Sequence, residues 1–205
     1  MRTMTAMGSI GALAHVLNEG RPFAVAAGAD VVILPTASAF SGAEAAAIQV
    51  ASLFEALGAK VEALMNTSRD SSDEPYFAQR LRDADFVVIS DGSALHATSV
   101  WRATPVGEAI RDSRSVIAVG AVASVFGDVM VDPRGGAPTN GLGYVQGLVI
   151  GVGGSDEQLA RTRSLLGDAL FAVLGQEGVV HFDGTTWRAI TDDVVTSRGT
   201  EVVAL

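Results

Sequence analysis

The chain has 205 residues, of which 48% are hydrophobic and 18% are charged, and its formal net charge is −9. This length and composition favour one domain with a sizeable core and disfavour disorder. The acidic balance argues against a nucleic-acid partner, and the absence of cysteine excludes disulfides and thiolate nucleophiles. No stretch approaches the ~20 uninterrupted apolar residues of a membrane span, and residues 1–17 have no sustained apolar core of a secretory signal. We therefore expect a cytoplasmic protein with one domain over residues 1–205.

In the first half of the chain, short apolar runs alternate with helical patterns. The run VVIL at 31–34 is typical of a buried strand. Val50, Leu53, Phe54 and Leu57 recur at i, i+3, i+4 and i+7, which indicates one face of a helix. The expected elements of this half are strands near 3–11 and at 31–34, 60–65 and 86–89, and helices at 12–18, 44–57 and 75–83.

The second half continues this alternation and then becomes rich in β-structure. The expected elements are strands at 116–119 and 148–150, helices at 94–102, 105–111, 122–127 and 156–174, and a turn-rich loop at 132–143. The tail reads as a β-hairpin at 179–190, followed by short strands at 194–195 and 202–203. Alternating strands and helices indicate a right-handed doubly wound sheet with a terminal antiparallel extension.

Two turns stand out as walls of a pocket. The predicted strand 86–89 ends in Ser90–Ser93, and the predicted strand 116–119 ends in Gly120–Ala121. Ligands of open α/β sheets bind where the carboxyl ends of strands meet the amino ends of helices. If the protein has a ligand site, we expect these two turns to line it.

The order of several motifs carries a family resemblance. The motifs are VVILPTAS at 31–38, LGAKVE at 57–62, ADFVVISDG at 84–92, TSVWRATP at 98–105 and GLG at 141–143. Together they resemble the cyanophycinase and aspartyl-dipeptidase group of serine peptidases, in the class I glutamine amidotransferase-like superfamily, over most of the chain. The resemblance implies an α/β fold, namely a flavodoxin-like three-layer sandwich with a mostly parallel sheet and a C-terminal β-hairpin extension.

The residues that would carry the chemistry of that group are replaced in this chain. The group has a serine nucleophile at a strained strand-to-helix elbow, and that position is Gly120 or Ala121 here. Its histidine position falls on Gly153, although an R-x-R pair persists at Arg161 and Arg163. Asp91 replaces a glycine in the turn whose backbone amides would face an oxyanion, where a carboxylate would repel the developing charge. We therefore expect no catalytic residue.

Three functional hypotheses follow from these replacements. The first is a pseudoenzyme that acts as a binding or assembly subunit, as a homodimer or with an active paralogue. The second is an active serine peptidase or amidase on small aspartyl peptides with a rearranged site, for example with Ser124 as a relocated nucleophile. The third is a small-metabolite binding protein that holds a small peptide or an amine-bearing ligand in the former cleft.

The expected ligand-binding residues lie in the two turns and at the start of the following helix: Asp91, Gly92, Ser93, His96, Gly120 and Ala121. A pairing of His96 with Ser93 or with Asp91 is one possible arrangement, and capping of the helix by Asp91 and Ser93 is the structural alternative. His15 and His181 lie in unrelated segments, and no histidine belongs to a paired carboxylate motif. We therefore expect neither a metal site nor a cofactor.

Overall fold

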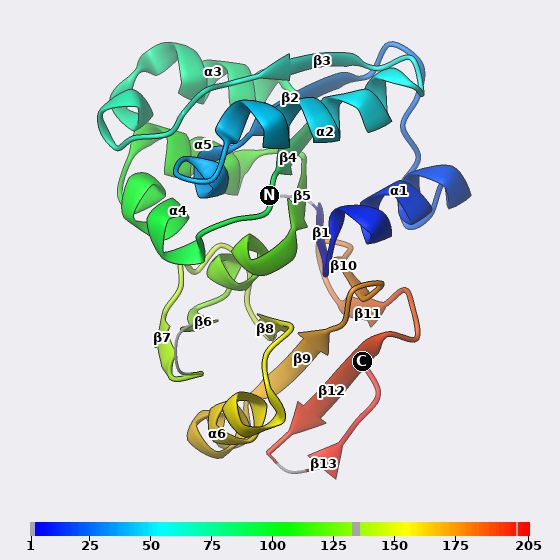
Figure 1. The fold of residues 1–205 in the computed structure, drawn as a ribbon, viewed down its shortest axis with the longest axis vertical. Coiled ribbons are helices and arrows are strands. Elements are labelled where there is room, and N and C mark those ends of the chain that lie inside the picture. Colours follow the sequence, from blue (N-terminus) through cyan, green and yellow to red (C-terminus); the bar gives the residue numbers. More distant parts are fainter. Residues whose placement is uncertain (1–2, 133–135, 200) are drawn as a thin grey trace.

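The computed structural model describes residues 3–132, 136–199 and 201–205. A seven-stranded sheet with the order β11-β10-β1-β5-β4-β2-β3 forms its centre (Figure 1). The strands from β1 to β3 in this order run parallel, whereas β10 and β11 extend the β1 edge in antiparallel fashion. The strands are β1 (Thr3–Met7), β2 (Asp30–Leu34), β3 (Lys60–Ala63), β4 (Phe86–Ile89), β5 (Ser115–Val119), β10 (Val179–Phe182) and β11 (Trp187–Ala189).

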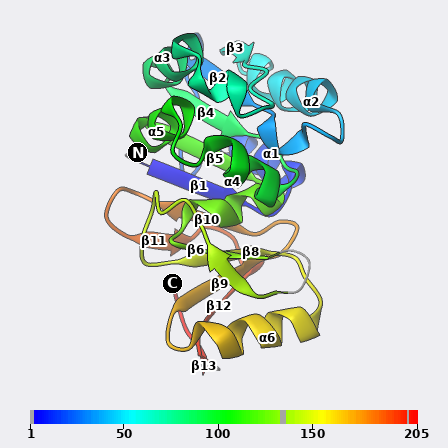
Figure 2. The same cartoon turned by 90° about the vertical axis from the view of Figure 1, so that its left-hand side faces the viewer.

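Helices cover both faces of the parallel part of this sheet, which gives three layers (Figure 2). Alternate residues of β2 divide between the two cores: Val31 and Ile33 face one, and Val32 and Leu34 face the other. The first core is completed by α1 (Ile10–Glu19) and α2 (Ala43–Glu55), and the second by α3 (Pro75–Asp83), α4 (Ala94–Trp101) and α5 (Pro105–Asp112). The expected flavodoxin-like three-layer α/β class is thus confirmed.

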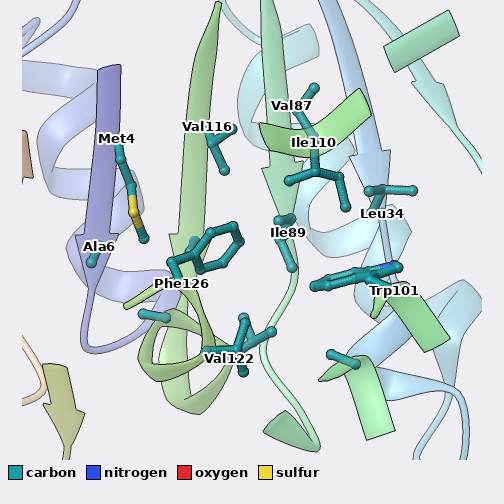
Figure 3. Packing of buried hydrophobic residues seen from close by; sticks show 14 of the residues in the cluster. Met4, Ala6, Leu34, Val87, Ile89, Trp101, Ile110, Val116, Val122 and Phe126 are labelled. Carbon is teal, nitrogen blue, oxygen red and sulfur yellow. The ribbon is translucent and has the colours of Figure 1, made fainter. Parts of the chain in front are cut away.

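Large buried side chains fill the second core (Figure 3). Trp101 and Phe126 are fully buried, and the ring of Phe126 contacts the ring of Tyr144 edge-on with centroids 5.9 Å apart. The indole N–H of Trp101 donates to Oδ1 of Asn66 over 3.1 Å, so this buried polar group keeps a partner. This core supports the ends of β4 and β5, where the candidate site lies.

A second sheet lies beyond the central one and has the order β13-β12-β9-β8 (Figure 1). Its strands are β8 (Val149–Val152), β9 (Leu170–Leu174), β12 (Val194–Arg198) and β13 (Glu201–Val202), and α6 (Asp156–Leu166) connects β8 to β9. The expected hairpin is β10–β11, and both short C-terminal strands are present. That the chain forms one domain over 1–205 stays a prediction.

The helix expected over 156–174 is wrong in its second half. The helix α6 ends at Leu166, and residues 170–174 form β9 between β8 and β12. The leucine spacing fits a helix, but Phe171, Ala172 and Leu174 are buried by pairing with strands on both sides. Tertiary pairing of β-prone residues therefore overrides the local periodicity.

The loop expected over 132–143 contains a strand. Residues Pro138–Asn140 form β7, which pairs with β6 (Val129–Val131) as an antiparallel hairpin. The turn-rich composition predicts a loop and so conceals this short strand. The strand can still form, because proline is tolerated in edge strands. The central part of the loop, 133–135, lies outside the described residues.

In the described ranges, every helix is too short or too polar to cross a bilayer.

Removal of a large side chain from the second core tests this packing. We expect Phe126→Ala to lower the free energy of unfolding by about 3–5 kcal/mol, because it removes a buried ring and leaves a cavity. Ile48→Ala, at a side chain 70% exposed on α2, should change it by less than about 0.5 kcal/mol. Urea denaturation of both variants measures the difference, and equal losses would contradict the assignment of Phe126 to the core.

His181 makes stability depend on pH at the junction of β1 and β10. Its Nδ1 lies 3.0 Å from Oγ1 of Thr5, and burial lowers the pKa of His181 below the ordinary value of 6.5. Below that value the unfolded chain binds the proton more readily than the folded chain, so acidification removes stability.

We expect the free energy of unfolding of the wild type to fall more steeply than that of His181→Asn between about pH 7 and about pH 5. His15→Asn, at an exposed histidine of α1, is the matched control and should keep the wild-type slope. Denaturation curves at several pH values decide this, and parallel slopes for the wild type and His181→Asn would contradict it.

Candidate functional site

Three turns meet at the carboxyl ends of adjacent parallel strands. Strand β2 runs into the 3₁₀ helix η1 (Thr36–Ser38), β4 runs into the turn Ser90–Ser93, and β5 runs directly into the 3₁₀ helix η3 (Gly120–Phe126). The sheet order β5-β4-β2 makes these turns neighbours. The structure thus brings together the two turns that the sequence singles out, at the edge where α/β proteins bind ligands.

The carboxylate of Asp91 links the turns after β4 and β5. Its Oδ1 accepts hydrogen bonds from the backbone N–H of Gly92 over 2.7 Å and of Ala121 over 2.8 Å. The hydroxyl of Ser38 donates to the Asp91 carbonyl over 2.5 Å and lies 3.2 Å from the hydroxyl of Ser90. The Asp91 side chain is exposed, yet both its backbone and its carboxylate are held in place.

The carboxylate lies directly over Gly120. This glycine has a φ of +71°, in the left-handed region, and forms the sharp step from strand to helix. A Cβ atom at this position would lie 2.0 Å from Cγ and 2.1 Å from Oδ1 of Asp91. Of the two candidate nucleophile positions, Gly120 has the left-handed backbone that a side chain would adopt only under strain, and Asp91 occupies the space that such a side chain would need.

Gly92 is required by a close approach of two backbones. Its φ is +149°, and a Cβ atom would lie 2.3 Å from the carbonyl oxygen of Ala37. The neighbouring N–H of Ser93 donates to that same carbonyl over 2.7 Å. The turn after β4 is therefore pressed against η1, and this contact fixes the direction from which the Asp91 carboxylate reaches Gly120.

Ser93 and His96 serve the start of α4. The hydroxyl of Ser93 accepts from the N–H of His96 over 3.2 Å and caps the helix, which is the expected structural alternative for this serine. The ring of His96 turns away from Asp91: its Nε2 lies 2.9 Å from the carbonyl oxygen of Thr67, and its ring contacts Phe40 edge-on. The structure therefore does not bring His96 and Asp91 together as a pair.

Gly153 borders a small cavity on one side of the elbow. The cavity has a volume of about 120 Å³, and its lining includes Ala121, Ser124, Gly153 and Gln158. A Cβ atom at Gly153 would have no neighbour within 4 Å, so the position expected for a histidine opens into free space. Ser124, which is 5% exposed, donates its hydroxyl to the carbonyl of Ala121 over 2.9 Å.

The R-x-R pair does not reach this cavity. Arg161 is exposed and Arg163 half-buried on α6, whose contribution to the lining is Gln158, Leu159 and Thr162. The retained spacing of the two arginines therefore has no counterpart in the geometry of the elbow.

A second cleft opens on the other side of Asp91. It has a volume of about 370 Å³, and besides Asp91 its lining includes Ser9, Gln49, Val119 and Gln176. The sequence interpretation missed Ser9, Gln49 and Gln176, which follow β1, lie on α2 and follow β9. The strand order brings these segments to Asp91, since β1 lies beside β5 and β10 and β2 lies beside β4, and no local motif marks them.

The histidines do not assemble a metal site. His15 lies on α1 and His181 on β10, whereas His96 lies on α4. Within the described ranges, no group of three or more His, Asp or Glu side chains could hold a metal ion. The absence of a cofactor stays a prediction.

One family model matches this chain, and two solved structures share its fold. A model of peptidase family S51 matches residues 4–126, a range that runs from the second residue of β1 through β5 to the end of η3. A peptidase from an acI-B1 Actinobacterium is 17% identical with a TM-score of 0.71, over 99% of this chain and 96% of that chain. A candidate peptidase E from Listeria monocytogenes EGD-e is 16% identical with a TM-score of 0.62, over 97% and 98%. These likenesses show a shared fold, and curated proteins give no match.

The contact between Asp91 and Gly120 predicts that substitutions at these two positions are not additive. We expect Gly120→Ala to cost about 1–2 kcal/mol for its left-handed backbone and about 1–3 kcal/mol more, because the carboxylate must leave its two amide donors. In an Asp91→Gly background, the same substitution should cost only the backbone part. A double-mutant cycle measured by chemical denaturation gives the coupling energy, expected at about 1–3 kcal/mol.

Gly153→Ala is the matched control for the backbone part. Its φ is +62°, close to that of Gly120, but its Cβ atom would meet free space. We therefore expect it to cost about 1–2 kcal/mol with no coupling to Asp91. Equal costs of Gly120→Ala and Gly153→Ala, or a coupling energy near zero, would contradict the steric role of Asp91.

Proposed function

Because this chain belongs to peptidase family S51, we propose that it is a member that has lost hydrolysis and acts as a binding or assembly subunit. The observation that supports this most directly is the Asp91 carboxylate seated over Gly120 at the elbow. Three requirements of serine-type hydrolysis bear on the proposal: a nucleophile, donors for an oxyanion and a base.

The nucleophile requirement is not met at the elbow. A serine hydrolase presents its hydroxyl from a strained turn between strand and helix. Gly120 retains the strained turn, with a φ of +71°, but carries no side chain. Ala121, the other candidate position, carries no hydroxyl either.

The oxyanion requirement is opposed by charge. Tetrahedral intermediates of acyl transfer are stabilised by backbone N–H groups that point at the developing negative oxygen. Here the N–H of Ala121, which follows the elbow residue, donates to Oδ1 of Asp91. A substrate oxygen at this place would have to displace a carboxylate and then develop its own negative charge beside it, which Coulomb repulsion disfavours.

The base requirement is not met at the expected place. The histidine position is Gly153, and the ring of His96 is engaged by Thr67 and Phe40. Ser124, the alternative nucleophile, donates its proton to a carbonyl within its own helical turn. Since loss of a single triad member costs orders of magnitude in rate, the combined replacements favour a protein without hydrolytic activity.

The proposed role as a subunit leaves two partners to distinguish, a second copy of this chain or an active paralogue. Both use the retained fold rather than the elbow chemistry. Light scattering of the purified chain separates the two, because a homodimer forms without any other protein.

Hydrolysis assays test the proposed loss of activity. We expect no turnover of aspartyl dipeptides or of a β-aspartyl-arginine polymer, and no labelling by a fluorophosphonate probe, because an activated hydroxyl is lacking at the elbow. Mass spectrometry of the probe-treated protein, with Ser124→Ala as the comparison variant, reads out any relocated nucleophile. Turnover together with labelling at Ser90, Ser93 or Ser124 would contradict the proposal.

A further inference from the structure

We propose that the cleft beside Asp91 binds a small organic ammonium, namely a protonated primary amine on a short aliphatic body. The inference names a ligand class for the proposed binding role, and it rests on that role, because a carboxylate seated at the elbow suits a bound cation and opposes an oxyanion. The cleft is the one of about 370 Å³ that opens between the β1–α1 turn, α2 and the ends of β4 and β5.

The charge of the cleft selects a cation. Of the described residues that line it, Asp91 alone is ionisable, so no lysine or arginine neutralises the carboxylate from within the lining. The whole chain carries a net charge of −9, which adds a favourable field for cations. An anionic ligand, such as the carboxylate end of an acidic peptide, would meet repulsion here.

The carboxylate is oriented before a ligand arrives. Both amide donors, Gly92 and Ala121, bond to the same oxygen, Oδ1. Oδ2 is therefore the oxygen that can accept a hydrogen bond from an ammonium group. Because the two amides already fix the side-chain rotamer, binding loses little side-chain entropy, and a hydrogen bond between ammonium and carboxylate is of the strong charge-assisted type.

The remaining lining suits a short aliphatic body. The half-buried Ile10 and Ala46 supply apolar surface, with the buried Val50 and Val119 behind them, while the exposed side chains of Gln49 and Gln176 add polar groups to the lining. Ser9 already donates its hydroxyl to the carbonyl of Gln176, and this bond ties the β1–α1 turn to the segment after β9. A volume of about 370 Å³ lies in the range of small-molecule sites.

Capping of α4 does not account for Asp91. The cap of α4 is Ser93, whose hydroxyl accepts from His96. The Asp91 carboxylate instead reaches across to the amide of Ala121 on the neighbouring turn. An asparagine could make the same contacts through its amide oxygen, so a purely structural role does not require the charge.

Asparagine at residue 91 would keep the shape of the side chain and remove its charge, so the variant Asp91→Asn tests the inference. Isothermal titration calorimetry compares n-butylammonium with neutral n-butanol and anionic butyrate, on the wild type and on Asp91→Asn. We expect the wild type to bind the ammonium at least about tenfold more tightly than either analogue, and Asp91→Asn to lose roughly tenfold or more in ammonium affinity. Asp112→Asn removes the same charge from an exposed position on α5 and should leave binding unchanged.

A second variant tests whether the ligand binds inside the cleft. Ala46→Phe, at a half-buried position of α2 that lines the cleft, keeps the Asp91 charge but fills the apolar space. We expect it also to lose ammonium binding. Thermal denaturation checks that each variant is folded. If Asp91→Asn does not fold, the ammonium affinity of Ala46→Phe tests the inference.

The inference would be overturned by no ammonium binding by the wild type, by equal binding of n-butanol or butyrate, or by unchanged affinity in folded Asp91→Asn or in Ala46→Phe. Calorimetry measures ammonium binding and does not depend on hydrolysis, so this test is separate from the hydrolysis assays. Absence of ammonium binding in a protein that also lacks turnover overturns the ligand assignment alone. Turnover overturns the proposed loss of hydrolysis whatever the calorimetry shows.

Discussion

The register of three parallel strands is the constraint on which the site depends. Backbone hydrogen bonds pair β2 with β4 and β4 with β5, with Leu34 opposite Ile89 and Ile89 opposite Ala118. All three strands therefore end at the same level, and the turns that follow them must share one small space. Glycine at 92 lets its backbone approach that of Ala37, and glycine at 120 leaves room for the Asp91 carboxylate. The chemistry of the site is decided by which side chain occupies the space that remains.

Asp91 occupies that space, and its effect is both steric and electrostatic. The carboxylate lies where a side chain at residue 120 would stand, and it uses the amide that a hydrolase would offer to its intermediate. The same two hydrogen bonds hold it ready for a cation. One carboxylate in the turn after β4 therefore accounts for a surface that disfavours developing negative charge and favours bound positive charge.

Most of the central sheet could be predicted from sequence because its signals are local. The apolar run at 31–34 predicts β2, because buried strands are apolar. Pro75 predicts the start of α3, because the fixed φ of proline suits the first helical turn. The strand β9 could not be predicted, since its burial comes from β8 and β12. The same holds for the site: Asp91 and Gly120 stand out in the sequence, whereas Ser9, Gln49 and Gln176 join them only through the order of strands.

The contact between Asp91 and Gly120 also constrains how this chain can evolve. A mutation to serine at residue 120 would place its Cβ atom 2.0 Å from Cγ of Asp91, so it would be destabilising while the aspartate remains. Loss of the aspartate alone would forfeit two hydrogen bonds without giving a nucleophile. Neither single step is favourable by itself, and this epistasis is a barrier against acquiring a serine at the elbow one mutation at a time.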